Sequence, residues 1–126
     1  MPTYTALSIV APHGENIRAG RKILEVRSWQ PPHLPLLNLL IVENERFLTE
    51  DGDIDPLGMA VALVDVHDVC LWETSQVDEA CATGWAPGYY AWRLVNVRPV
   101  SGNPVVAAKR RLYEVLVADD LLNVEV

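Results

Sequence analysis

The sequence has little of what marks a secreted, membrane-spanning or metal-binding chain. It contains two cysteines, Cys70 and Cys81, whose spacing matches no common metal site. Its longest apolar stretch, residues 34–42, is interrupted by Pro35 and Asn38 and falls short of the roughly 20 residues that a membrane span requires. The N-terminal residues lack the basic start and the small-residue cleavage site of a signal peptide. We therefore expect a cytoplasmic protein that uses no membrane, metal or cofactor.

Positive charge is also scarce, and it is unevenly placed. The formal net charge is −7, and between Glu43 and Tyr90 the only cation is Arg46. The acidic residues of this stretch are Glu43, Glu45, Glu50, Asp51, Asp53, Asp55, Asp65, Asp68, Glu73, Asp78 and Glu79. The remaining cations are Arg18, Arg21, Lys22, Arg27, Arg93, Arg98, Lys109, Arg110 and Arg111. A protein this acidic is a poor general binder of phosphate backbones, but a local basic pocket would favour small or single-stranded ligands over long duplexes.

The length of 126 residues, half of them hydrophobic, fits one compact domain with a sizeable core. Apolar patterns predict strands over residues 4–10, 22–29, 36–43, 59–70 and 88–100. Pro12 and Gly20 bound a short helix over residues 12–19, and a second helix is expected over residues 73–84. Residues 105–117 are expected to form a helical turn that runs into a last strand. Because regular βαβ alternation is absent, we expect an α+β fold, a small mixed β-barrel with two or three short peripheral helices.

The stretch GRKILEVRSW, residues 20–29, places charges inside an otherwise apolar strand. Because alternate side chains share one face of a strand, Glu25 and Arg27 are neighbours, roughly 6–7 Å apart at the backbone. Lys22 follows the preceding turn, and a twist there would bring it to Glu25. On a solvated face such a pair would contribute ~0–1 kcal/mol and need no further role. The apolar neighbours and Trp29 favour a partly enclosed site, where a functional role is the better reason for the charges.

The same region resembles a known family. The sequence LSIVAPHGENIRAGRKILEVRSW, residues 7–29, is similar to the signature of the ASCH domain family, which belongs to the PUA-like superfamily. The motif G-x-K-x-x-E-x-R of that family is matched by Gly20, Lys22, Glu25 and Arg27. A second segment, YYAWRLVNVRPV at residues 89–100, resembles the family's penultimate strand. The resemblance covers most of the chain and implies a single domain over residues 1–126, folded as a PUA-like β-barrel with a cleft beside the motif.

In this family the cleft is thought to receive RNA, single-stranded nucleic acid or a modified nucleobase, so these are the partners that the resemblance implies. The expected ligand-binding residues are Lys22, Glu25, Arg27, Trp29, Trp92, Arg93, Lys109 and Arg110. The cations can meet phosphate or a base carbonyl, the glutamate can accept from an exocyclic amine, and the tryptophans offer stacking faces. Trp92 is expected to lie half in the core and half in the cleft floor. The basic patch KRRLYE, residues 109–114, is either a solubilising turn or a guide for a phosphate chain.

An enzymatic alternative comes from the same resemblance. Some small relatives resemble N4-acetylcytidine amidohydrolases, which are said to use a lysine and a threonine of this motif together with a separate glutamate. Lys22 matches the lysine, Glu25 stands in the threonine's place, and no further acid aligns. The pair is therefore a candidate catalytic set for an amidohydrolase acting on N4-acetylcytidine or a similar nucleoside, or for a ribonuclease. A lysine beside a carboxylate tends to stay protonated, which favours binding over base catalysis.

Two patterns resemble metal sites without meeting their requirements. Asp51, Asp53 and Asp55 lie in a polar loop over residues 44–58, but the glycine and glutamate of a calcium-binding EF-hand loop are absent, so a solvated acidic loop is expected. In the predicted strand 59–70, Asp65 and His67 face one way while Asp68 and Cys70 face the other. A regular strand cannot bring them to one ion.

Two further features stay open. His13 lies in the first predicted helix near the motif, where it could reach the cleft or could be an ordinary surface histidine. The acidic belt, residues 43–79, would suit a third class of function, a protein-interaction domain. Pull-downs sensitive to reversal of those charges would support that class.

Overall fold

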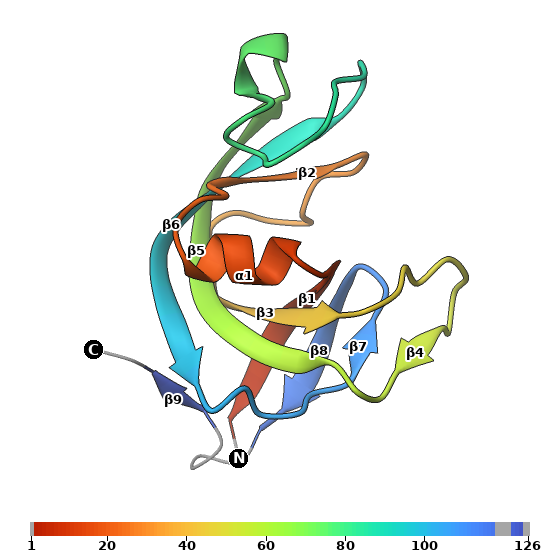
Figure 1. Ribbon diagram of the computed structural model, residues 1–126, viewed down its shortest axis with the longest axis vertical. Coiled ribbons are helices and arrows are strands. Elements are labelled where there is room, and N and C mark those ends of the chain that lie inside the picture. The colour runs from red at the N-terminus through yellow and green to blue at the C-terminus, as the bar shows by residue number, and fades with distance from the viewer. Residues whose placement is uncertain (1, 118–121, 125–126) are drawn as a thin grey trace.

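The computed structural model describes residues 2–117 and 122–124, which are mostly β-strand (Figure 1). The large sheet has the strand order β2–β6–β5–β3–β1–β8, with β9 paired to the end of β6. Its strands are β1 (Thr3–Val10), β2 (Leu24–Arg27), β3 (Leu36–Asn44), β5 (Met59–Leu71), β6 (Tyr90–Ser101), β8 (Leu112–Leu116) and β9 (Asn123–Val124). A small sheet pairs β4 (Ile54–Asp55) with β7 (Ala108–Lys109). The helical elements are α1 (His13–Arg18) and the 3-10 turn η1 (Thr74–Gln76).

The large sheet curls around α1 as a half-barrel, with β5 and β6 as its long bent strands (Figure 1). The β5–β6 pairing is interrupted by register shifts between Leu63 and Asp65 and between Val66 and Val69. Such irregularities bend a strand and increase its local twist. The predicted fold class is confirmed at this level, because the described chain is a mostly β, curled sheet with few helices.

The central strands are buried on both faces. Leu7 of β1 and Ile41 of β3 pack with Ile17 of α1 on the inner face, and all three are fully buried. Ala6 and Leu40 belong to a second cluster on the opposite face. Helix and loops therefore cover both sides of β3, which explains why its sequence is continuously apolar instead of alternating.

The second predicted helix, over residues 73–84, is wrong except for the 3-10 turn η1. The following residues instead direct their carbonyl groups towards β2. The Glu79 carbonyl accepts hydrogen bonds from the backbone N–H groups of Ile23 (2.9 Å) and Leu24 (3.1 Å). Cys81 then adopts a positive φ of 52°, which a helix interior does not allow. Pairing with the edge strand takes the carbonyl groups that a longer helix would have used.

The helical turn predicted near residue 105 is also wrong, although the last strand predicted after it is confirmed as β8. Val105 forms an isolated bridge to Met59, and the Val106 N–H donates to the Gly58 carbonyl at 2.9 Å. The backbones approach so closely that a Cβ on Gly58 would lie 2.4 Å from the Val106 oxygen, so a side chain is not tolerated there. The described residues therefore hold one α-helix and one 3-10 turn, against the two or three helices expected. None of their helices is long and apolar enough to cross a membrane.

A buried carboxylate, Asp65, stabilises the irregular part of the sheet. It accepts hydrogen bonds from the Asn38 N–H (2.9 Å), the Asn96 side-chain amide (2.9 Å) and the Arg98 guanidinium (3.2 Å). Asn38 of β3 and Asn96 of β6 both have positive φ, at 56° and 53°, so the carboxylate holds a left-handed residue on each of the two strands that flank β5. Burial raises the pKa of Asp65, but these three donors and the charge of Arg98 outweigh it and lower the pKa to about 2.

We expect Asp65→Asn to lower the free energy of unfolding by roughly 1–2 kcal/mol at neutral pH. The folded pKa lies below the ordinary value of 3.8, so the stabilisation is complete above about pH 4 and is lost as the pH falls towards about 2. Urea unfolding should therefore show that the difference in the free energy of unfolding between wild type and Asp65→Asn becomes smaller over this acid range. Asp68→Asn, at an exposed position of the same strand, is the control and should change stability by less than about 0.5 kcal/mol. Equal effects of the two substitutions would contradict this assignment.

Candidate functional site

A cavity of about 530 Å³ opens where β8 stops pairing with β1. The two strands pair from Thr3 opposite Leu116 to Leu7 opposite Leu112, and residues 8–10 of β1 continue into the cavity wall. The lining consists of Ser8, Ile9, Val10, His13, Lys22, Glu25, Val26, Arg27, Trp29, Asn44, Arg46, Phe47, Leu48, Trp72, Ala80, Cys81, Ala82, Thr83, Gly84, Arg110 and Arg111. The motif strand β2 thus forms one wall, and the end of β1, the start of α1 and the loops that follow β3, β5 and β7 form the rest.

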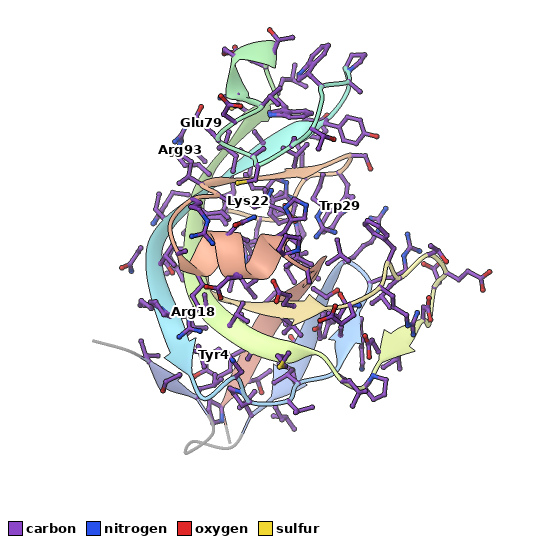
Figure 2. The ribbon with its side chains drawn as sticks, viewed as in Figure 1. Tyr4, Arg18, Lys22, Trp29, Glu79 and Arg93 are labelled. Atoms are coloured by element: carbon purple, nitrogen blue, oxygen red, sulfur yellow. The ribbon has the colours of Figure 1, made fainter. Side chains whose placement is uncertain are left out.

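Lys22 lies in the turn between α1 and β2, deep beside the helix (Figure 2). Gly20, with a φ of 80°, lets the chain reverse after α1, and the Lys22 N–H then donates to the Asn16 carbonyl at 3.0 Å. The Lys22 Nζ donates to the Ala80 carbonyl at 2.5 Å and lies 3.4 Å from Glu25 Oε1. The loop that replaced the predicted helix therefore supplies one of the lysine's acceptors.

Glu25 joins Lys22 to Arg27 at the base of the cavity. The Arg27 Nε and Nη2 atoms both donate to Glu25 Oε2, at 2.9 and 2.7 Å. Lys22 and Glu25 are only 3% and 4% exposed, whereas the Arg27 side chain is 23% exposed. Glu25 is therefore chiefly a positioning residue for two cations. Within this triad of Lys22, Glu25 and Arg27, the Arg27 side chain is the most accessible.

Arg27 also connects the edge strand β2 to β1. Its Nη2 atom donates to the Ser8 carbonyl at 2.9 Å, at the point where β8 no longer covers β1. Ser8 uses its hydroxyl to donate to the Lys109 carbonyl. The Arg27 and Ser8 side chains therefore connect separate parts of the barrel where the backbone pairing of β1 with β8 ends. The cavity lies beside these contacts.

The two cations keep Glu25 ionised. Burial by itself would raise the pKa of Glu25, but the charges and hydrogen bonds of Arg27 and Lys22 outweigh it and lower the pKa below its ordinary value. Glu25 is thus an ionised acceptor at neutral pH and has no proton to donate. Burial, followed by the charge of Lys22, lowers the pKa of His13, so its imidazole is neutral at neutral pH. The buried Nδ1 atom of His13 has no hydrogen-bond partner within the described part of the chain.

Arginines and a tryptophan surround the mouth of the cavity. The Arg111 guanidinium carbon lies 4.9 Å from the centre of the Trp29 ring, in a cation–π contact. Trp29 in turn packs edge-to-face on Trp92, with ring centres 5.0 Å apart, and its carbonyl accepts from Trp92 Nε1 at 3.3 Å. Arg110, from the same loop as Arg111, and Arg46, from the loop after β3, complete the cationic rim. The mouth therefore combines positive charge with the aromatic ring of Trp29, and the contacts with the buried Trp92 fix the orientation of that ring.

The segment that carries Arg110 and Arg111 is fastened at several points. Its β7 strand pairs with β4, and the Tyr113 hydroxyl donates to the Ala107 carbonyl at 2.9 Å. Burial raises the pKa of Tyr113 to about 12, so this hydroxyl keeps its proton at neutral pH. The rim arginines are consequently held beside the cavity by contacts with β1, β4 and β8.

The structure brings together five of the residues expected from the sequence, Lys22, Glu25, Arg27, Trp29 and Arg110. Trp92 is fully buried beneath Trp29 and does not line the cavity, in contrast to the half-exposed floor that we expected. Arg93 and Lys109 also lie outside the lining. Arg93 follows the inward-facing Trp92 on β6 and therefore points to the other face, on the side of β2 away from Trp29 (Figure 2).

Sequence reasoning did not single out Arg46, Phe47 or Arg111 as site residues. The sequence signal for Arg46 is its isolation as the only cation between Glu43 and Tyr90, a pattern that by itself does not link it to the motif. Arg111 lies in the basic patch over residues 109–114, but its positive φ of 59° decides its direction, and that angle has no sequence signature. Phe47 is 75% exposed at the mouth, so a loop residue supplies an aromatic group that the strand pattern did not reveal.

The aspartates of the acidic loop have other partners, and Asp65 of the second metal-like pattern is bound by Asn38, Asn96 and Arg98 as described above. Asp51 pairs with Arg110, Asp53 pairs with Arg46, and Asp55 accepts from the Leu57 N–H at 3.0 Å. Among the described residues, no group of three or more histidine, cysteine, aspartate or glutamate side chains could hold a metal ion.

A curled half-barrel with a charged pocket beside its edge strand defines a small, mostly β domain. The sequence model of the ASCH domain matches residues 7–102, and the chain belongs to this family. The structure is similar to the crystal structure of ASCH from Zymomonas mobilis, with 14% identity, a TM-score of 0.52, and coverage of 86% of this chain and 87% of that chain. This likeness supports the PUA-like fold that the sequence implied.

Two variants of the Zymomonas mobilis protein are also similar. A serine-to-alanine variant has 12% identity and a TM-score of 0.48, covering 86% of this chain and 88% of that chain. A tyrosine-to-phenylalanine variant has 12% identity and a TM-score of 0.47, covering 86% and 90%. A comparison with curated proteins found no match.

Proposed function

We propose that the cavity binds single-stranded RNA or a modified nucleoside, with one base inserted towards Arg27. The observation that carries this proposal is the combination of a cationic rim, made by Arg46, Arg110 and Arg111, with a floor of fixed hydrogen-bonding charges. The cavity volume falls within the roughly 300–1,000 Å³ typical of small-molecule sites. An RNA base needs an unstacked, accessible edge to be read in this way, so a single strand suits the site better than a duplex.

The chemistry of the lining suits a base with its attached phosphates. Arg27 offers a partly exposed guanidinium that can meet a base carbonyl, and Trp29 and Phe47 offer stacking faces near the mouth. The rim arginines match phosphate oxygens. The acidic surface elsewhere repels a long polyanion, which favours ligands that contact the protein mainly at this pocket.

Fluorescence anisotropy with a short labelled single-stranded RNA tests this proposal. We expect Arg27→Ala to weaken binding by about tenfold, because a hydrogen bond to a charged group contributes about 1.5–3 kcal/mol. Lys22→Ala should also weaken binding, because it removes a cation that holds Glu25 at the floor of the cavity. Arg21→Ala, which removes an exposed cation bound to Asn16 in α1, is the matched control and should leave affinity nearly unchanged.

Because Lys22 and Arg27 also neutralise Glu25, circular dichroism must show that each variant is folded at the binding temperature. Unchanged affinity in both folded variants would refute the proposed site. A wild-type protein that binds no single-stranded RNA and no nucleoside would refute the proposed function itself.

A second candidate function is hydrolysis of N4-acetylcytidine or a similar nucleoside, or cleavage of RNA. The observation that favours it is the cluster of Lys22, Glu25 and a neutral His13 around one cavity. An ionised Glu25 and a neutral imidazole are both proton acceptors, so such an enzyme would take its general acid from another group. Incubation with N4-acetylcytidine, followed by chromatography for cytidine, tests the first reaction. RNA integrity with and without divalent metal tests the second, and no change in either assay leaves the binding function.

A further inference from the structure

The acidic loop between β3 and β4 contacts the rim of the cavity. Asp51 Oδ1 lies 2.6 Å from Arg110 Nη1, and Asp53 Oδ1 lies 3.3 Å from Arg46 Nη1. Neither aspartate lines the cavity, so each holds its arginine from the outer side. The two acids offset two of the positive charges that the proposed function assigns to phosphate.

The register of the small sheet places these acids. Ile54 of β4 pairs with Lys109 of β7, so the residues before Ile54 lie beside the residues after Lys109. A turn brings Asp51 into position, since the Asp53 N–H donates to the Glu50 carbonyl at 3.0 Å and Gly52 has a φ of 85°. The contact between Asp51 and Arg110 is therefore set by folding and joins residues 59 positions apart.

The two ion pairs differ in how firmly they are held. Asp53 also accepts from the Thr49 N–H, and Arg46 also donates to the Ile54 carbonyl at 2.9 Å, so this pair is part of the loop's own structure. Asp51 is 97% exposed in its side chain, and its ion-pair partner is Arg110. An ion pair this exposed contributes little and exchanges readily with another anion.

We propose that Asp51 is a specificity-determining residue that competes with the ligand's phosphate for Arg110. The inference rests on the proposed function, because it assigns Arg110 to a phosphate of the bound strand. In the free protein the carboxylate occupies the guanidinium, and a ligand must displace it to gain that contact. Anions without a base to insert bind weakly as a result, whereas a single strand compensates through its contacts within the cavity. Asp51 thus raises the preference of the site for an inserted base over bare phosphate.

The test compares Asp51→Asn with Glu50→Gln, which removes the same unit of charge from the adjacent exposed residue of the same loop. Two probes are used at low salt: a short single-stranded RNA by anisotropy and inorganic tripolyphosphate by calorimetry. We expect Asp51→Asn to bind both probes about two- to fivefold more tightly than wild type, and Glu50→Gln to differ by less than about 1.5-fold. The gain should be larger for tripolyphosphate than for RNA, and it should disappear when Arg110→Ala is present in both backgrounds.

The outcomes separate this inference from the proposed function. Tighter tripolyphosphate binding by Asp51→Asn, with no RNA binding by any variant, supports the competition and refutes RNA as the ligand. RNA binding by wild type, with equal effects of Asp51→Asn and Glu50→Gln, refutes the competition and keeps the function. Weaker binding of both probes by Asp51→Asn would also overturn the inference, since it would mean that Asp51 orients Arg110 for the ligand. Failure of wild type and Asp51→Asn to bind either probe overturns both.

Discussion

Replacing Glu25 with alanine should lower the free energy of unfolding by about 3–5 kcal/mol, the loss expected when one partner of a buried ion pair is removed. Lys22 would keep its hydrogen bond to the Ala80 carbonyl but lose its countercharge. Arg27 would lose the two hydrogen bonds that its Nε and Nη2 atoms donate to Glu25. Lys22 is 3% exposed, so its ammonium group has little access to water that could replace the carboxylate. Urea unfolding followed by circular dichroism measures the loss directly.

Two further variants make this result interpretable. Glu45→Ala removes an exposed glutamate in the loop after β3 and should change stability by less than about 0.5 kcal/mol. Glu25→Gln keeps the volume and some acceptor capacity, so its loss should be smaller than that of Glu25→Ala. A loss below about 1 kcal/mol for Glu25→Ala would mean that the triad is effectively solvated, and the description of the cavity floor would have to be abandoned.

The second large effect is expected at the mouth of the cavity. The double variant Arg110→Glu with Arg111→Glu should weaken binding of single-stranded RNA by about 100-fold at low salt, because two attractive phosphate contacts become repulsive. The slope of the logarithm of affinity against the logarithm of salt should become shallower by roughly 1.4, since each lost contact on a single strand accounts for about 0.7. Anisotropy titrations at several salt concentrations measure both quantities.

A matched control separates the contact from the change in net charge. Arg93→Glu with Lys109→Glu makes the same change, from −7 to −11, because each reversal removes two units of charge. These two cations lie outside the cavity lining, so this variant should weaken binding far less. Equal losses in the two double variants would show that only overall charge matters, and the rim would lose its assigned role.

Lys109 and Arg110 are neighbours in the basic patch, and of the two Arg110 lines the cavity. The basic patch was recognised as a candidate guide for phosphate, but neighbouring residues of a strand end point in different directions. Lys109 of β7 pairs with Ile54 of β4, whereas Arg110 turns towards the cavity and Asp51. Which cation reaches the site depends on a two-residue strand pairing, and so short a pairing has no periodic pattern to reveal it.

The error over residues 73–84 has a related cause. A cap residue, helix-forming side chains and a closing glycine made a helix the reasonable local prediction. The segment's carbonyl groups instead bind Ile23, Leu24 and the Lys22 ammonium group. Tertiary contacts with the motif strand thus outweigh a local helix preference, and the loop they create forms one wall of the cavity.

The sequence by itself determined the apolar faces of the main strands, the short helix after β1, and the sharing of one face by Glu25 and Arg27. These features depend on residues a few positions apart, whose relative directions follow from the geometry of a strand or a helix turn. Only the tertiary structure decided that Lys22 meets Ala80, 58 residues away, and that Arg110 meets Asp51, 59 residues away. Such contacts depend on strand register and loop direction across the whole sheet. For that reason the charged motif was visible in the sequence, whereas the enclosure and the cationic rim that make it a site were not.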